Sequence, residues 1–438
     1  MTIKPTNVHS TLSKYILADG FDLVYDMNKS KGSQIYDSRT GQYLLDCFSF
    51  FATSPLGCNH PALATPEFKK KMGEIAINNP TNSDIYTVEM ADFVDTFGRL
   101  AMPKHFQHLF FVAGGALGIE NGIKTAFDWK VRKNLARGKG ELGHQVIHFK
   151  DAFHGRTGYT LSMTNTFNQD KTKFFTKFDW PRIINPKIQF PLTKEHLQQV
   201  RQLEQQAIQE IEQAVKNNSN DIAALIIEPI QAEGGDNHFR KEFFLEIRRL
   251  CDQHEMMFIV DEVQCGMGLT GKLWAYQHFG FEPDILAFGK KTQVCGIMVS
   301  NRVDEITNNV FKVPSRLNST WGGNLVDMVR CQKYLEVMKE ENLVKNAENQ
   351  GKQLLKGLEE MQEKYPQIIS NARGRGLMCA FDLPTPEQRD SFKQKLYEQK
   401  VIILGCGAST IRFRPPLTFT SDDVTTVLSA IDTVAHNF

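Results

Sequence analysis

Short, wholly apolar segments alternate with longer amphipathic ones through the middle of this 438-residue chain, and no other feature limits its fold as strongly. The apolar segments predict strands at residues 108–112, 145–149, 223–227, 257–260 and 285–288, and the amphipathic ones predict helices at 116–134 and 240–255. Strands that are apolar along their whole length are typical of a mainly parallel sheet covered by helices on both faces. We therefore expect an α/β fold whose ligands bind beyond the carboxyl ends of the strands.

The two ends of the chain have a different pattern. Residues 34–48 predict a hairpin, because apolar residues flank a central turn signal. Beyond residue 342, helical segments come first and are followed by further apolar stretches. We expect residues 1–80 and 336–438 to form a smaller α+β domain together, packed against a large domain of residues 81–335.

The charge balance excludes some classes of partner. Lys plus Arg number 51 and Asp plus Glu number 50, so a net charge of +1 gives no electrostatic argument for nucleic acid or an anionic membrane. The first 20 residues are polar and no apolar run reaches the ~18 residues of a membrane span, so we expect a soluble, cytoplasmic protein. None of the 8 cysteines forms a C-x-x-C pair, and no metal site is predicted.

Small residues follow the first predicted strand, at Gly114, Gly115 and Ala116. They let the backbone approach an anion, and the N-terminus of the next helix supplies free N–H groups, so the turn could hold a phosphate. A turn from strand to helix also needs glycine for its geometry alone, and the pattern by itself does not separate these two interpretations.

An aromatic residue and an arginine follow the second predicted strand. Phe153 could stack on a flat ring, and Arg156 could hold a carboxylate through two parallel hydrogen bonds. Taken alone, the phenylalanine is equally compatible with core packing, and the arginine with a charged surface.

Acids follow the fourth predicted strand and lysines the fifth. Asp261 and Glu262 could pair with a protonated heterocyclic nitrogen or cap a helix. Lys290 and Lys291 stand where an amine is partly desolvated, which lowers its pKa and makes it a nucleophile able to form a Schiff base. A pair of exposed lysines is the alternative for this motif alone.

The residues at these four strand ends indicate a cofactor more specifically in combination than each does alone. A phosphate cradle, an aromatic ring, a carboxylate and a lysine are the parts that hold pyridoxal 5′-phosphate (PLP). The lysine binds the aldehyde, the acid keeps the pyridine nitrogen protonated, and the aromatic residue covers one face of the ring. The sequence therefore predicts a PLP site.

The segment FIVDEVQCGMGLTG at residues 258–271, followed by DILAFGK at 284–290, resembles the signature of the class III (ornithine/GABA-type) PLP aminotransferases. The resemblance covers residues 37–418, approximately. It implies the PLP-dependent transferase fold of the aspartate-aminotransferase type and an amino-transfer activity.

The resemblance implies a role for each residue around the cofactor ring. Lys290 would be the Schiff-base lysine and proton shuttle, because it directly follows the glycine at the family spacing. Asp261 would pair with the pyridine nitrogen, and Gln264 would contact the ring hydroxyl. Val263 and Phe153 would cover the two ring faces, with Phe153 standing in place of the usual tyrosine.

The phosphate contacts depart from the wider family. Gly115 and Ala116 would hold the phosphate, but residues 114–117 (GGAL) replace the usual serine-glycine-hydroxyl-glutamate turn, so backbone N–H groups have to contribute more. Thr320 would reach the phosphate from the partner subunit. The resemblance thus implies a homodimer with shared sites.

Five further segments, FGKKTQVCG, SRLNSTWGGN, KFDWPRI, RGRGLMCAF and RFRPPL, are most similar to the subgroup that transaminates the terminal amine of L-lysine. The substrate residues that this similarity implies are Arg156, Gln264, Glu233, Arg412 and Asn318. Glu233 would neutralise Arg412 while lysine reacts and swing away when the acceptor arrives, helped by the two glycines that follow it. A static ion pair, or a solvated glutamate in a flexible loop, is the alternative.

The expected reaction transfers the terminal amine of L-lysine to 2-oxoglutarate and yields L-glutamate and 2-amino-6-oxohexanoate, which cyclises to a piperideine carboxylate. An ω-aminotransferase acting on ornithine or 4-aminobutyrate, and a PLP aminomutase or racemase, share the fold and stay open. A non-enzymatic regulator with this fold is a further alternative, against which the presence of both Asp261 and Lys290 argues.

Overall fold

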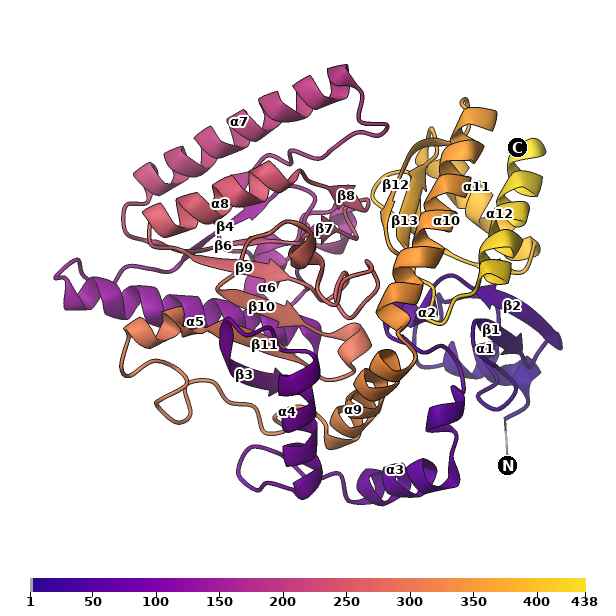
Figure 1. Ribbon diagram of the computed structural model, residues 1–438, viewed down its shortest axis with the longest axis horizontal. Helices are drawn as coiled ribbons and strands as arrows, with labels where there is room; N and C mark the ends of the chain where they lie inside the picture. Colours follow the sequence, from indigo (N-terminus) through magenta and orange to yellow (C-terminus); the bar gives the residue numbers. More distant parts are fainter. Residues whose placement is uncertain (1–2) are drawn as a thin grey trace.

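Seven strands form the central sheet of the structure, a computed structural model that describes residues 3–438 (Figure 1). In spatial order they are β3 (Phe106–Val112), β11 (Cys295–Ser300), β10 (Ile285–Phe288), β9 (Met257–Asp261), β6 (Ile222–Ile227), β4 (Gln145–Phe149) and β5 (Arg182–Ile183). The pairs from β10 to β5 are parallel, whereas β11 runs antiparallel to both of its neighbours. The expected α/β fold with a mainly parallel sheet is confirmed.

Strand β11 is an element that the sequence pattern did not predict. It contains Gly296, and a glycine inside a strand weakens the pattern by which strands are recognised. The structure gives the reason for this glycine: a Cβ there would collide with the carbonyl oxygen of Phe110 on β3 and lie 2.8 Å from the ring of Phe288. Gly296 therefore permits the close approach of β3 and β10 to β11.

Helices cover both faces of this sheet, with α7 and α8 on one side and α5 on the other (Figure 1). All six residues of β6 are buried, and its side chains are divided between two separate cores. Leu225 packs in the core that includes Phe244 of α8, whereas Ile226 packs in the core that includes Ile123 of α5. The helices are α1 (Val8–Leu12), α2 (Ser49–Ala52), α3 (Pro66–Asn78), α4 (Val88–Leu100), α5 (Gly115–Ala136), α6 (Gly158–Met163), α7 (Lys194–Asn217), α8 (Lys241–Gln253), α9 (Leu325–Glu340), α10 (Leu343–Lys364), α11 (Pro386–Glu398) and α12 (Ser421–His436).

The two ends of the chain lie together on one side of the central sheet (Figure 1). Val401 of β14 pairs with Leu45 of β2, so one small sheet contains strands from both ends. The predicted boundary between residues 335 and 336 falls within α9, and the division into domains stays a prediction. The smaller sheets contain β1 (Gln34–Asp37), β2 (Gln42–Asp46) and β14 (Val401–Ile402); β12 (Ser370–Arg375), β13 (Met378–Asp382), β16 (Thr410–Arg412) and β15 (Leu404–Cys406); and β7 (Ile230–Gln231) and β8 (Asn237–His238). Within residues 3–438, no helix has the length and apolar character needed to cross a membrane.

Candidate active site

A cavity of about 440 Å³ lies beyond the carboxyl ends of the parallel strands. Its walls bring together most of the residues that the sequence analysis selected, and Thr320 and Asn318 lie outside it. The selected residues that line it are Gly115, Ala116, Phe153, Arg156, Glu233, Asp261, Val263, Gln264, Lys290 and Arg412.

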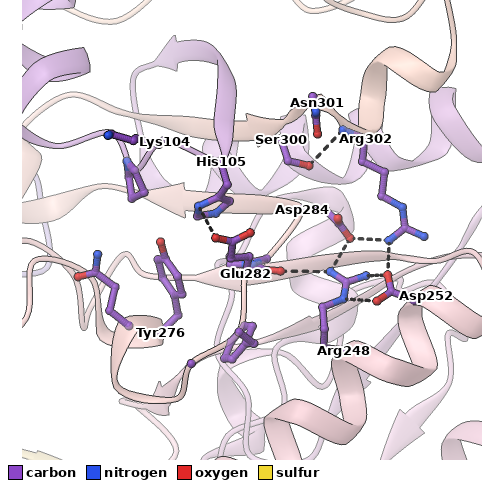
Figure 2. A pocket seen from close by; sticks show the side chains of 15 residues that line it. Lys104, His105, Arg248, Asp252, Tyr276, Glu282, Asp284, Ser300, Asn301 and Arg302 are labelled. Atoms are coloured by element: carbon purple, nitrogen blue, oxygen red, sulfur yellow. Dashed lines mark hydrogen bonds and ion pairs between the residues drawn. The ribbon is translucent and has the colours of Figure 1, made fainter.

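A larger cavity of about 860 Å³ lies at the opposite edge of the sheet, where β10 begins and β11 ends (Figure 2). Apart from Lys104, its charged side chains pair with one another. Arg248 and Arg302 each lie 2.9 Å from the same carboxylate oxygen of Asp284. This cavity is lined by a surface ion-pair network and contains none of the predicted site residues.

The phosphate cradle is the N-terminus of α5. Gly114 precedes the helix with a φ of 112°, a conformation that favours glycine, and within the described chain the first helical turn has neither a side-chain cap nor an acidic residue. The free N–H groups and the positive end of the helix therefore face the cavity unneutralised. A Cβ at Gly115 would lie 3.1 Å from Val263, so small residues also serve the packing of this turn.

Asp261, the last residue of β9, is fixed by two hydrogen bonds. Its Oδ2 lies 2.9 Å from Nδ1 of His154, and its Oδ1 accepts from the backbone N–H of Val263 at 3.0 Å. Glu262 points elsewhere: its carboxylate accepts from the backbone N–H groups of Ala275 and Tyr276, and burial raises the pKa of Glu262 to about 7. The capping role considered for this pair of acids therefore belongs to Glu262, and Asp261 faces the cavity.

The two adjacent lysines have different surroundings. Lys290 lines the cavity, and in the part of the chain that the structure describes its amine has no hydrogen-bond partner. Burial, and then the charge of Arg412, lower the pKa of Lys290. Lys291 is buried and its amine donates to the carbonyl oxygen of Gln264 at 2.6 Å; burial lowers the pKa of Lys291 to about 7. The geometry favours Lys290 as the lysine that reacts.

Glu233 and Arg412 form an ion pair inside the cavity, with Oε2 of Glu233 2.9 Å from Nη2 of Arg412. The other oxygen of Glu233 lies 3.1 Å from Nζ of Lys171. Burial acts to raise the pKa of Glu233, but the charges of Arg412 and Lys171 outweigh it and hold that pKa below its ordinary value. Glu233 is therefore a carboxylate shared by two cations.

Packing and backbone conformation explain the two glycines that follow Glu233. A Cβ at Gly234 would collide with the carbonyl oxygen of Asp151, and the carbonyl oxygen of Gly235 accepts a hydrogen bond from Arg373 at 2.5 Å. Close packing requires a small residue at Gly234, and a φ of 126° favours glycine at Gly235. Movement of this loop stays a prediction.

Thr320 and Asn318 lie in the segment that precedes α9. The backbone oxygen of Thr320 accepts a hydrogen bond from Ser83 at 3.0 Å, and Asn318 caps the backbone N–H of Ser319 at 2.7 Å. Neither residue lines the cavity of its own chain, so roles for both in the site stay predictions that need a second subunit.

The sequence analysis missed five residues that line the cavity: Phe51, His154, Gly155, Lys171 and Glu228. Glu228 directly follows β6, so the strand-end argument used elsewhere would have found it; burial raises the pKa of Glu228 to about 7. His154 lies in the loop that also supplies Phe153. Phe51 lies in α2, where all residues have positive φ and form a left-handed turn that the pattern does not indicate.

A model of the family described as "Aminotransferase class-III" matches residues 17–435. The chain belongs to the class III aminotransferases. An L-lysine-epsilon aminotransferase from Mycobacterium bovis is 50% identical and covers 98% of this chain and 95% of its own length. One from Amycolatopsis lactamdurans is 47% identical, with 97% and 94% covered. A lysine aminotransferase from M. tuberculosis, solved in the internal aldimine form, is 49% identical, covers 99% of both chains and superimposes with a TM-score of 0.96.

Class III aminotransferases use PLP, and the cavity of this one fits that cofactor. An uncapped helix N-terminus suits the phosphate, an enclosed carboxylate that is already oriented suits the ring nitrogen, and a buried amine suits the aldehyde. The enzyme is therefore a PLP-dependent aminotransferase, and the cavity that fits its cofactor lies beyond the strand ends.

Proposed function

We propose that this aminotransferase moves the terminal amine of L-lysine to 2-oxoglutarate and forms L-glutamate and 2-amino-6-oxohexanoate, which cyclises to a piperideine carboxylate. The Glu233–Arg412 ion pair in the cavity carries the proposal, because a site that takes these two molecules has to present and conceal one positive charge. The lysine aminotransferases among the relatives support the choice of donor.

The cofactor would be held by residues already brought together. Gly115 and Ala116 would bind the phosphate through backbone N–H groups, and Asp261 would bind the ring nitrogen. Phe153 and Val263 would pack on the ring, and Gln264 would contact the ring hydroxyl. These assignments rest on the shared cavity and the family resemblance.

Bound PLP supplies an aldehyde that captures the donor's amine and an electron-withdrawing ring that stabilises negative charge on the neighbouring carbon. Asp261, as a fixed carboxylate, would keep the ring nitrogen protonated. Lys290, with its lowered pKa, would accept a proton from the carbon that carries the reacting nitrogen and return it. His154 would hold Asp261 in the orientation that this chemistry needs.

Two arginines would sort the substrate carboxylates. Lysine reacts at its far end, so its α-carboxylate lies several bonds from the reacting carbon, where Arg156 would bind it. Glu233 would neutralise Arg412 beside the bare methylenes of lysine. The carboxylate next to the keto group of 2-oxoglutarate would instead take Arg412, and Arg156 would hold its distal carboxylate.

We also propose a cytoplasmic homodimer in which Thr320 and Asn318 complete the partner's site. Both residues lie outside the cavity of their own chain, as a contribution across an interface requires. Mixing Lys290→Ala and Thr320→Ala subunits tests this: activity should reappear in mixed dimers, because one of the two sites regains both residues. No recovery in verified mixed dimers would contradict shared sites.

A screen of amine donors with the purified, PLP-loaded protein and 2-oxoglutarate tests the function. L-Lysine should give the highest kcat/KM for glutamate formation, ahead of ornithine and 4-aminobutyrate. A preference for either of those donors would replace the proposed substrate, and turnover of lysine without an acceptor would indicate a mutase or racemase.

A further inference from the structure

Glu233 bridges two cations of different character. Arg412, at 2.9 Å, is enclosed, with 3% of its side chain exposed, whereas Lys171, at 3.1 Å, is 32% exposed. Each cation contacts a different carboxylate oxygen. Glu233 therefore lies between a fixed charge inside the cavity and a second charge at its edge.

The backbone around Glu233 is held, so movement at this position is limited to the side chain. The carbonyl oxygen of Glu233 accepts from the backbone N–H of Gly407 at 2.8 Å. Three residues further on, Asp236 forms a bidentate pair with Arg414 at 2.5 and 2.9 Å, and both side chains are about 1% exposed. A rotating side chain moves its carboxylate only a short distance, so any second position has to lie close to the first.

Glu233 does not use the full hydrogen-bonding capacity of Arg412. Nε and Nη1 of Arg412 are buried and find no hydrogen-bond partner among residues 3–438. The pair is thus made through one nitrogen, whereas a guanidinium binds a carboxylate best through two parallel hydrogen bonds. An incoming carboxylate can compete for Arg412, and Glu233 then loses its enclosed partner.

We propose that Lys171 is the second partner of Glu233: it retains the carboxylate of Glu233 when the carboxylate of the acceptor binds Arg412. This inference rests on the proposed lysine and 2-oxoglutarate half-reactions. A displaced Glu233 without Lys171 would stay partly buried with no cation, close to the like charge of the acceptor, which is unfavourable. Lys171 acts on specificity through Glu233 and is a positioning residue.

The two half-reactions depend on Lys171 unequally. When lysine is bound, Glu233 stays on Arg412 and the contribution of Lys171 is small. When a dicarboxylate is bound, Glu233 depends on Lys171 alone. Loss of Lys171 therefore acts in the opposite direction to loss of Glu233, which exposes Arg412 and penalises lysine.

Lys171→Met tests this, because methionine keeps the apolar stem and removes the charge. Lys173→Met is the matched control, since Lys173 lies on the same segment and pairs with Asp170 at 2.5 Å rather than with Glu233. Two quantities are measured on the PLP-loaded protein: the Kd of glutarate, an unreactive dicarboxylate, by calorimetry, and the single-turnover rates with L-lysine and L-glutamate.

We expect Lys171→Met to weaken glutarate about fivefold or more and to slow the glutamate half-reaction similarly, a typical size for coupling between two sites. The lysine half-reaction should stay within about twofold, and Lys173→Met should leave all three values unchanged. An unchanged Kd for glutarate, or equal losses in both half-reactions, would overturn the proposal.

The Glu233→Ala background separates an indirect role from a direct contact with the acceptor. In that background, Lys171→Met should change the Kd of glutarate by less than about twofold. In the parent protein, Lys171→Arg keeps the positive charge and should retain the parent Kd. If Lys171→Met weakened glutarate binding in the Glu233→Ala background as much as in the parent, Lys171 would bind the acceptor itself. The glutarate titration uses no lysine, so a parent inactive on lysine would refute the proposed function and leave this test intact.

Discussion

Nδ1 of His154 lies 2.9 Å from Oδ2 of Asp261, and both side chains are enclosed. When the carboxylate of Asp261 is ionised it can only accept a hydrogen bond, and this bond then requires the proton on Nδ1. The second oxygen of Asp261 accepts from the backbone of Val263, which leaves the carboxylate no freedom to turn away from the cavity. A carboxylate held in this way is suited to keep a ring nitrogen protonated.

The charge of Asp261, beyond its shape, should determine the rate. Asp261→Ala should slow proton abstraction by about three orders of magnitude, and Asp261→Asn should lose nearly as much, because the amide keeps the shape and loses the charge. Single-turnover cofactor spectra measure the step. An Asp261→Asn variant that reacts at close to the parent rate would show that the proposed role is wrong.

Covalent attachment of the cofactor should map to Lys290. Borohydride reduction of the PLP-loaded protein, followed by peptide mapping, should place the adduct there, because, of the two adjacent lysines, Lys290 lines the cavity and Lys291 does not. Lys291→Met should retain the adduct and lower the melting temperature, since it removes the hydrogen bond to Gln264. An adduct on Lys291 would show that the assignment of Lys290 as the Schiff-base lysine is wrong.

Arg156 should distinguish lysine from an amine that lacks the α-carboxylate. Its guanidinium carbon lies 5.8 Å from the centre of the Phe153 ring, on the cavity wall. Arg156→Ala should lower kcat/KM for L-lysine about a hundredfold, the size expected for a charge-assisted bidentate contact, and that for cadaverine much less. Equal losses for both donors would remove Arg156 from the substrate site.

Glu233→Ala should alter selectivity more than stability. An uncovered Arg412 favours carboxylates, so the lysine half-reaction should slow while the glutamate half-reaction is kept or improved. A static buried pair would instead mainly contribute stability, since breaking one costs about 3–5 kcal/mol. Single-turnover rates for both donors, with a thermal melt of each variant, separate the two; equal losses in both half-reactions would make Glu233 structural.

The sequence predicted the parts of the site that strand ends position. Asp261 ends one apolar strand and Lys290 closely follows another, and parallel strands bring their carboxyl ends to one edge. The same argument would have found Glu228, which was passed over. The pairing of Glu233 with Arg412 came from resemblance, because residues so far apart in the sequence show no common local pattern.

Other features depend on contacts between elements that no local pattern records. Lys171 reaches Glu233 from the end of a short 3-10 helix, Gln169–Lys171, and the composition of this segment gives no indication of a partner. The two glycines after Glu233 suggested flexibility, whereas the backbone of Asp151 requires a small residue at Gly234 and a φ of 126° favours glycine at Gly235. Such residues become interpretable only when the packing is known.

The position from which the nitrogen is taken tests the central claim most directly. L-Lysine labelled with 15N at the ε-amine is incubated with 2-oxoglutarate and the PLP-loaded enzyme, and the L-glutamate formed is examined by mass spectrometry. The account predicts fully labelled glutamate from ε-labelled lysine and unlabelled glutamate from α-labelled lysine. Unlabelled glutamate from the ε-labelled donor would contradict it, because the enzyme would then be transaminating the α-amine.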